Sequence, residues 1–301
     1  MNARLTFVHA LSPLHAGTGQ GASVIDLPIA REKATGLPFL PGSSLKGTLR
    51  ARCSGQNCPK VFGPDAAEIQ TDSNQASAAQ FSDQRLLLLP IRSLAGTFAW
   101  VTSPYVLRRL ARDIEDAGVN APAEPIPNIQ STDACAIATD TSKIEIGSKV
   151  YLEDLELDAQ TSTGVSKWAE WIGEQVFPND KTWQQMLMDR MCVVHDDVFN
   201  FMIDTATEIT ARIKLREDAK TVQEGGLWYE EALPTETILS GIMLATPTKT
   251  AGITAQEVFT VLQELTGKTL QFGGKATVGR GLCRVQLAEE AKKGSTNNAN
   301  A

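Results

Sequence analysis

The sequence predicts an α+β fold whose core is a ferredoxin-like βαββαβ unit enlarged by insertions. Residues 4–11 alternate as a half-buried strand does, and residues 43–54 have the pattern of a helix. Residues 81–103 contain two apolar runs typical of buried strands. After a long interruption the chain closes with an amphipathic helix at 254–267 and a short strand at 282–287. In order, these are strand, helix, strand, strand, helix and strand.

Local signals justify the elements of the first half of the chain. In residues 4–11 every second side chain is large, beginning with Leu5 and Phe7. The helix at 43–54 follows Pro-Gly, and its serines can cap the first turn. A break at 93–96 divides residues 81–103 into a hairpin. Next, Ser103, Pro104 and Gly118 predict a helix with its N-cap, first position and terminator.

The interruption contains shorter signals. Strands are predicted at 134–139, 149–155, 191–194 and 206–216, and helices at 166–177 and 181–189; a further strand is predicted at 235–246. Residues 64–80 and 217–226 are polar and predict loops. We expect one domain over residues 1–288 and a disordered polar tail at 289–301.

Composition limits the classes of function. The chain has 301 residues, is 42% hydrophobic and carries a formal charge of −7, which argues against coating of nucleic acid through bulk charge. Residues 1–60 nevertheless contain seven basic side chains and two acidic ones, so a local polyanion site is compatible with the sequence. No apolar run or signal-peptide pattern predicts membrane insertion or export, and a cytoplasmic location without membrane contact is expected.

The cysteines do not predict a metal site. Five cysteines are scattered along the chain, and four residues separate Cys53 from Cys58 where a zinc knuckle has two. With three histidines in the chain, structural zinc is disfavoured. Free thiols in a reducing compartment are expected.

The segment 273–281 has the composition of a phosphate-binding loop. It contains Gly273, Gly274, Lys275, Gly279, Arg280 and Gly281. Backbone N–H groups of such a loop can surround a phosphate while the two cations add charge. The segment matches neither a Walker loop nor G-x-G-x-x-G, so it does not indicate a nucleotide cofactor. The alternative is a tight turn before the last strand.

Three motifs, together with this glycine-rich loop, carry a family resemblance. They are Pro-Leu-His-Ala-Gly-Thr-Gly at 13–19, Asp-Leu-Pro-Ile-Ala-Arg-Glu at 26–32 and Pro-Gly-Ser-Ser-Leu-Lys-Gly-Thr-Leu-Arg at 41–50. In this order and spacing they resemble the RAMP superfamily of CRISPR proteins. More narrowly, the chain is similar to the backbone subunits of the type III-B effector, the Cmr complex. The resemblance covers nearly the whole chain.

The resemblance implies an RRM-like palm that binds CRISPR guide RNA and stacks head to tail on further copies of itself. A projecting β-hairpin, the thumb, would splay one nucleotide at regular intervals, and we expect it at about 206–236, centred on 211–233. Partners implied in the same way are complementary target RNA, other RAMP subunits, small helical subunits and a large polymerase-like subunit. Target RNA would be cleaved at each splayed position.

The resemblance assigns catalysis to Asp26. It is the one acidic residue among the first thirty-one, in a locally basic stretch. A carboxylate there suits a divalent metal ligand, with Mg²⁺ expected, and the RNA 2′-hydroxyl would be the nucleophile. The alternative is an Asp that caps a turn before Pro28. His15 is a second catalytic candidate, which would contact the phosphate or move a proton, or else hydrogen-bond the loop backbone.

Further residues are candidates for RNA contact. Ser43 and Ser44 lie at a predicted helix N-terminus, while Lys46 and Arg50 share one of its faces, so guide-backbone contact competes with a solvated charged face. In the thumb, Trp228 and Tyr229 would stack on bases or pack the hairpin on the palm, and Glu230 and Glu231 are a weak candidate second carboxylate.

Three other functions compete with target cleavage. In the first, the chain is an RNA-binding scaffold whose Asp26 is not catalytic. A standalone endoribonuclease that processes the guide precursor is disfavoured because no pair of catalytic histidines is evident among His9, His15 and His195. An unrelated small-molecule enzyme lacks a cofactor fingerprint.

Overall fold

The computed structural model describes residues 2–19, 24–64, 76–139, 142–216, 218, 221–246 and 252–288. The expected tail at 289–301 and most of the expected loop at 64–80 lie outside these residues. No helix in the described ranges is both long enough and apolar enough to cross a bilayer.

Four antiparallel strands form the palm. They are β1 (Asn2–Ala10), β4 (Gln84–Arg92), β13 (Ile238–Ala245) and β15 (Leu282–Leu287), in the spatial order β15-β1-β13-β4. Helix α1 (Gly42–Arg52) connects β1 towards β4, and α7 (Ala255–Leu265) connects β13 towards β15. This is the ferredoxin-like order, so the predicted fold class is confirmed.

The long interruption lies at a different place in the fold from the one predicted, which was between the third strand and the second helix. The predicted hairpin exists, since β4 pairs with β5 (Phe98–Thr102) in antiparallel register. However, β5 is not the third palm strand. That strand is β13, and the insertion separates the second palm strand from the third. The error arose because the sequence shows that two strands are adjacent in the chain but not which strand pairs with β1.

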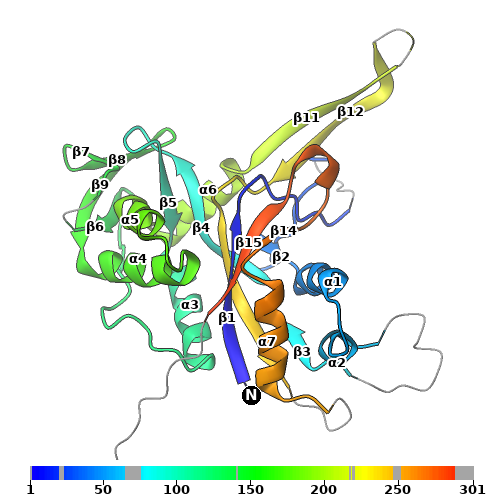
Figure 1. Cartoon of the computed structure of the whole chain (residues 1–301). Helices are drawn as coiled ribbons and strands as arrows, with labels where there is room; N and C mark the ends of the chain where they lie inside the picture. The colour runs from blue at the N-terminus through cyan, green and yellow to red at the C-terminus, as the bar shows by residue number, and fades with distance from the viewer. Residues whose placement is uncertain are drawn as a thin grey trace, which may run out of the picture.

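The insertion extends the palm sheet instead of forming a separate body (Figure 1). Beyond β5 the sheet continues through β10 (Met191–Val194), β6 (Ala134–Ala138), β9 (Leu155–Ser162), β8 (Lys149–Leu152) and β7 (Glu145–Ile146). At the other edge lies β14 (Thr269–Gln271), while β2 (Phe39–Leu40) pairs with β4 and β3 (Ala79–Phe81) pairs with β13.

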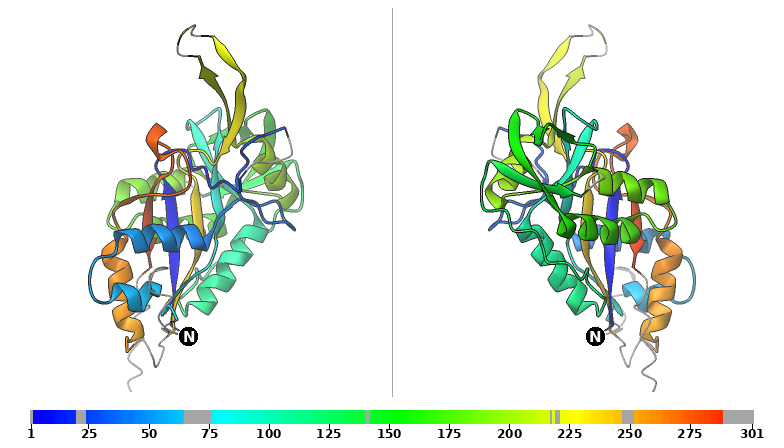
Figure 2. Two further views of the ribbon diagram at one scale, coloured as in Figure 1. Left: turned by 90° about the vertical axis from the view of Figure 1, so that its right-hand side faces the viewer. Right: turned by 90° about the vertical axis from the view of Figure 1, so that its left-hand side faces the viewer.

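Helices cover both faces of the palm (Figure 2). One group contains α1, α2 (Cys58–Phe62) and α7; the other contains α3 (Pro104–Asp116), α4 (Thr163–Val176) and α5 (Lys181–Arg190). The alternation of β1 explains this arrangement, because Arg4 lies over the Phe259 ring of α7 while Phe7 contacts Trp171 of α4. A last helix, α6 (Asp196–Thr205), precedes the thumb.

The cap signals read from the sequence operate as expected at α3, where the Ser103 hydroxyl accepts from the Val106 N–H. Helix α7 has a complete capping box between Thr254 and Glu257. At α1 the expectation is wrong, since Pro41 is the N-cap and no side chain of the cap residue bonds the helix. The α1 end is stabilised instead by Asp83, which accepts from the Gly42 N–H at 2.8 Å.

The thumb is the two-stranded hairpin of β11 (Glu208–Leu215) and β12 (Val222–Ala232), which projects away from the palm (Figures 1 and 2). Its predicted position is therefore correct. The predicted polar loop at 217–226 is too long, because β12 already begins at Val222 and pairs there with Leu215. Cross-strand pairing overrides the low strand propensity of the Gln-Glu-Gly-Gly stretch.

The expectation of five free thiols is wrong at one pair. Cys53 and Cys58 form a disulfide. Helix α1 ends at Arg52 and α2 begins at Cys58, so the tight connection brings the two Cα atoms to 5.9 Å, within the usual disulfide range. Cys135, Cys192 and Cys283 are free and buried, and burial raises the pKa of the Cys283 thiol to about 12.

Candidate nucleic-acid interface

A groove of about 460 Å³ lies between the segment after β1, the first turns of α1 and the glycine-rich loop. Its lining includes His15, Gly17, Ser44, Thr48, Gln271, Gly273 and Gly274. Gly273 has a φ of +68°, and a Cβ there would overlap the carbonyl oxygen of His15. The loop can approach the segment at 13–17 this closely because it lacks that side chain.

His15 is buried and lines the groove. Its Nδ1 lies 2.6 Å from the carbonyl oxygen of Glu231, so Nδ1 carries the proton and donates this bond. The neutral ring then has Nε2 as its acceptor, and Gly17 and Gly274 lie directly against the ring. His15 therefore joins its own segment to the thumb and remains at the groove surface; the carbonyl it bonds lies in β12, and not in the loop backbone as the alternative interpretation expected.

Asp26 is exposed at the base of the thumb. Its Oδ2 accepts a 2.8 Å hydrogen bond from the Tyr229 N–H of β12. The neighbouring backbone is fixed as well, because the Leu27 N–H bonds to the Tyr229 carbonyl and the Glu231 N–H bonds to the Leu27 carbonyl. The side chains of Asp26 and His15 thus bond to opposite ends of one three-residue stretch of β12, Tyr229 to Glu231, although eleven positions separate them in the sequence.

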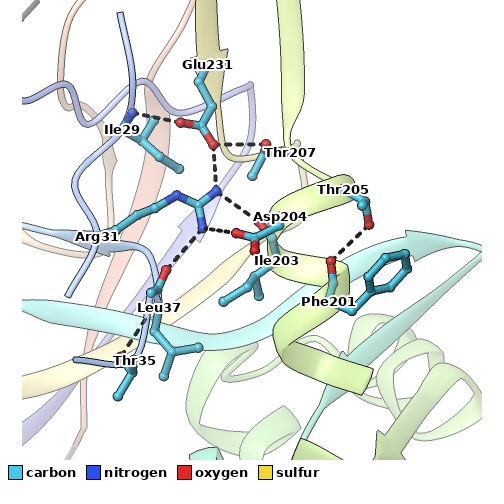
Figure 3. A network of polar contacts seen from close by, with 11 residues as sticks. Ile29, Arg31, Thr35, Leu37, Phe201, Ile203, Asp204, Thr205, Thr207 and Glu231 are labelled. Atoms are coloured by element: carbon cyan, nitrogen blue, oxygen red, sulfur yellow. Dashed lines mark hydrogen bonds and ion pairs between the residues drawn. The ribbon is translucent and has the colours of Figure 1, made fainter. Parts of the chain in front are cut away.

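The buried carboxylate of Glu231 is bonded to the segment that follows Asp26 in the chain (Figure 3). Glu231 accepts from the Arg31 guanidinium at 2.7 Å, the Thr207 hydroxyl at 3.0 Å and the Ile29 N–H at 3.1 Å. Arg31 also donates to the Ile203 carbonyl near the end of α6. The network joins the segment after Asp26 to both the thumb and α6, so it fixes the backbone that presents Asp26.

Glu230, the adjacent carboxylate, is equally buried and is also held by cations. Its Oε1 lies 2.8 Å from Lys275 Nζ and accepts from Trp228 Nε1 at 2.8 Å, while Oε2 accepts from Arg212 Nε at 3.3 Å. Burial alone would raise the pKa of Glu230, but Lys275, Trp228 and Arg212 together lower it to about 2. Neither Glu230 nor Glu231 is therefore available as a second solvent-facing carboxylate.

The two cations of the glycine-rich loop face the thumb. Lys275 bonds to Glu230 and lies 5.9 Å from the centre of the Trp228 ring. Arg280, which is 8% exposed, donates to the Thr210 hydroxyl of β11 at 3.0 Å. Gly279 and Gly281 give the loop its left-handed turns on either side of Arg280. The loop thus presents backbone, and not these two side chains, to the groove.

The candidate residues of α1 separate into two environments. Ser44 lines the groove and Ser43 is exposed beside it. Lys46 is half-buried, and both this burial and the nearby Arg50 lower its pKa. Arg50 donates to the Pro64 carbonyl at 2.7 Å, which directs it toward the segment after α2.

The aromatic pair of the thumb also divides. Trp228 packs at the base of the hairpin against Lys275 and bonds to Glu230, as the packing interpretation expected. Tyr229 is 39% exposed. Sequence reasoning missed Arg31, Thr207 and Asp83 as structural supports of the site; Arg31 lies within the second motif, whereas Thr207 and Asp83 gave no local signal.

No group of three or more His, Cys, Asp or Glu side chains in the described ranges is arranged to hold a metal ion. Asp26 is therefore a single exposed carboxylate. Such a donor fits Mg²⁺ where phosphate oxygens and water supply the remaining ligands, because Mg²⁺ is commonly held by one or two carboxylates together with substrate phosphates.

Residues 7–284 match the RAMP superfamily, and the chain belongs to it. Within that superfamily it is 37% identical over 303 residues to the CRISPR system Cmr endoribonuclease Cmr4 of Pyrococcus furiosus, covering 98% of this chain and 99% of that relative. The family prediction is thereby confirmed.

Solved structures agree with the fold. The crystal structure of oligomeric Cmr4 from Pyrococcus furiosus has a TM-score of 0.75 at 30% identity, covering 97% of this chain and 99% of that one. A subunit in the cryo-EM structure of the type III-B Cmr-beta complex bound to cognate target RNA has a TM-score of 0.71 at 20% identity, covering 95% of this chain and 97% of that one.

Proposed function

We propose that this protein is a guide-RNA-binding backbone subunit of a type III-B CRISPR effector and that it cleaves complementary target RNA in the cytoplasm. The observation that carries the proposal is Asp26, an exposed carboxylate whose orientation is fixed by the Tyr229 N–H at the base of a projecting hairpin. The relative from Pyrococcus furiosus is itself named an endoribonuclease.

The groove supports binding of an RNA backbone. Gly273, Gly274 and the first turn of α1 offer backbone and hydroxyl groups of small size, so a phosphate can approach closely. The N–H groups of Gly42 and Gly274 are not among these donors, because Asp83 and the His15 carbonyl already accept from them. Ser43, Ser44 and Lys46 are the α1 residues that remain for the guide backbone, and such contacts carry no sequence preference.

The thumb supports the separation of adjacent bases. One face of the hairpin carries apolar side chains that are 39–54% exposed: Ile209, Ile213, Leu215, Val222, Leu227 and Tyr229. The register pairs Ile213 with Leu227 and Leu215 with Val222, so these side chains lie on one face. An apolar wedge can unstack neighbouring bases at a cost of a few kcal/mol per step.

The cleavage chemistry needs few protein groups. Once a nucleotide is splayed, its 2′-oxygen can attack the adjacent phosphorus in line while the bond from that phosphorus to the 5′-oxygen of the next nucleotide breaks. The products are a 2′,3′-cyclic phosphate and a 5′-hydroxyl, so the proton lost by the 2′-hydroxyl is balanced by the one the 5′-oxygen takes up. Positioning accounts for most of the catalysis. Mg²⁺ is the proposed cofactor and, when bound, supplies charge neutralisation at the phosphate. Asp26 would hold it together with the RNA. His15, whose Nδ1 is committed to Glu231, would accept a hydrogen bond at Nε2 from the groove side.

Further copies of this chain and the other subunits of the effector are the proposed protein partners. The relative of known structure is described as oligomeric, which supports head-to-tail assembly along the guide. The competing function is a scaffold that binds RNA without cutting it. It differs from the proposal only in the role of Asp26.

The test uses the assembled complex with matched target RNA. Asp26→Asn keeps the side-chain shape and removes its charge, so we expect unchanged assembly and guide binding but loss of target cleavage. Chelation of divalent ions should abolish the wild-type cuts as well. The control is Asp154→Asn, an exposed aspartate between β8 and β9 that lies outside the groove. Wild-type cleavage by Asp26→Asn would favour the scaffold.

A further inference from the structure

We propose that the glycine-rich loop acts as a clamp on the base of the thumb, with Lys275 as a positioning residue for Asp26. This inference rests on the proposed function, since it concerns the geometry of the candidate catalytic carboxylate. It assigns to the loop cations a role different from direct contact with RNA.

One side of the clamp is the contact with β12. Lys275 Nζ lies 2.8 Å from Glu230 Oε1, and the Glu230 side chain is 3% exposed. Lys275 itself occupies the left-handed region with a φ of +67°, a conformation that costs a non-glycine residue free energy. Glycine would adopt this turn without strain, so we infer that a favourable contact of the lysine side chain offsets the free-energy cost of the backbone conformation. The ion pair with the buried carboxylate of Glu230 is the contact that does so.

The other side of the clamp is the contact with β11. Arg280 donates to the Thr210 hydroxyl at 3.0 Å, and its Nη1 lies 3.9 Å from Glu208 Oε2. Each strand of the thumb therefore receives one cation from the same nine-residue loop. Two attachment points on opposite strands restrict rotation of the hairpin about its own axis, which one contact could not do.

The loop is itself attached to the palm, so the clamp has a fixed base. The Gly274 N–H donates to the His15 carbonyl at 3.0 Å, and the Gly281 N–H donates to the Pro13 carbonyl at 2.9 Å. Movement of the thumb relative to the groove must therefore break the Lys275 and Arg280 contacts. The clamp therefore acts together with the contacts of His15, Leu27 and Glu231 to set the position of the thumb relative to the RNA-binding groove.

Asp26 takes its orientation from the strand that Lys275 holds. Glu230 forms a bridge with Leu27, and the preceding residue, Tyr229, donates its N–H to Asp26. Loss of the ion pair between Lys275 and Glu230 would loosen this stretch of β12. The Tyr229 N–H, which orients the Asp26 carboxylate, would then be held less firmly. Outer partners of this kind typically contribute 10- to 100-fold to the activity of a site.

The experiment compares Lys275→Met, Glu230→Gln, the double variant and Lys275→Arg in the assembled complex. We expect both single variants to slow single-turnover cleavage 10- to 100-fold without changing guide affinity or its salt dependence. The double variant should be no slower than the slower single one, and Lys275→Arg should restore most of the rate. The matched control is Lys268→Met, which removes an exposed lysine five residues before the loop begins at Gly273.

A second readout does not depend on cleavage. The Tyr229 N–H donates to Asp26, and its hydrogen exchange should become at least tenfold faster in Lys275→Met and Glu230→Gln and stay unchanged in Lys268→Met. If Lys275 contacted RNA instead, Lys275→Met would weaken guide binding and flatten its salt dependence, and Glu230→Gln would leave cleavage intact. That result, or unchanged Tyr229 exchange, overturns the clamp. If instead Asp26→Asn still cuts, the proposed function fails while the exchange measurement still tests the clamp.

Discussion

The carboxylate of Glu231 is the support whose removal has the most measurable consequence. In Glu231 one oxygen, Oε1, accepts from both Arg31 and Thr207, and Oε2 accepts from the Ile29 N–H. Glu231→Gln can keep an oxygen at the first position, but its NH₂ group then faces the Ile29 N–H, donor against donor, and the Arg31 pair loses its opposite charge. Glu231 is 3% exposed, and water cannot replace the lost contacts on its side. Arg31, with a side chain 23% exposed, can partly rehydrate, which limits the loss.

The magnitude follows from these contacts. Hydrogen bonds to charged groups contribute about 1.5–3 kcal/mol each. Losing one of them in full and weakening the Arg31 pair gives a destabilisation of about 3 kcal/mol. In a chain of this length an unfolding entropy of about 2.1 cal/mol/K per residue converts that figure to a fall in Tm of about 5 °C.

The assay is thermal and urea unfolding of the purified chain, with Glu224→Gln as control because Glu224 is an exposed glutamate on the outer part of β12. We expect the control to stay within about 0.5 kcal/mol of the parent. A Glu231→Gln protein as stable as the control would refute the reasoning, since the network around Arg31 would then contribute nothing to the fold.

Two further predictions concern the loop and the thumb. Gly273→Ala should lower guide-RNA affinity at least tenfold in a binding titration, because its Cβ would overlap the His15 carbonyl. Gly279→Ala is the control: its φ is +78°, but no atom lies within 4 Å of the added Cβ, so its effect should be smaller. Equal losses of affinity would show that backbone strain, and not the close approach to His15, is responsible. Because the pKa of Glu230 is lowered, its ion pairs stabilise the fold above pH 4.5 and lose that contribution as the pH falls to about 2. The difference in free energy of unfolding between the parent and Glu230→Gln should therefore shrink over this pH range and stay constant above it. Unfolding measured as a function of pH checks this.

The sequence predicted the elements that have strong local signals. Ser103, Pro104 and Gly118 delimit α3 by chain chemistry alone, and the alternating side chains of residues 4–11 predicted β1, which is buried on both faces from Arg4 onward. The pairing of strands has no such local signal. The sequence placed the third palm strand at β5, and only the tertiary structure reveals that β13, more than a hundred residues later, pairs with β1.

The site shows the same division. Motifs predicted Asp26, His15 and the glycine-rich loop as site residues from residue type and order, and the structure brings these segments together at the groove and the base of the hairpin. The motifs did not predict that Lys275 and Arg280 face the thumb, because the direction of a long side chain depends on carboxylates that lie distant in the chain, Glu230 and Glu208. The disulfide was missed because its geometry depends on where α1 ends and α2 begins.

The continuous sheet has a consequence for how copies of this chain can associate. A long sheet leaves two rims of unpaired backbone groups, and such rims readily recruit another chain and lead to aggregation. Here the terminal strands are β14, with three residues, and β7, with two, so neither rim offers a template of useful length. Copies of this chain that associate would therefore have to join through side chains, helices or the hairpin, and not by extending the sheet from one copy to the next.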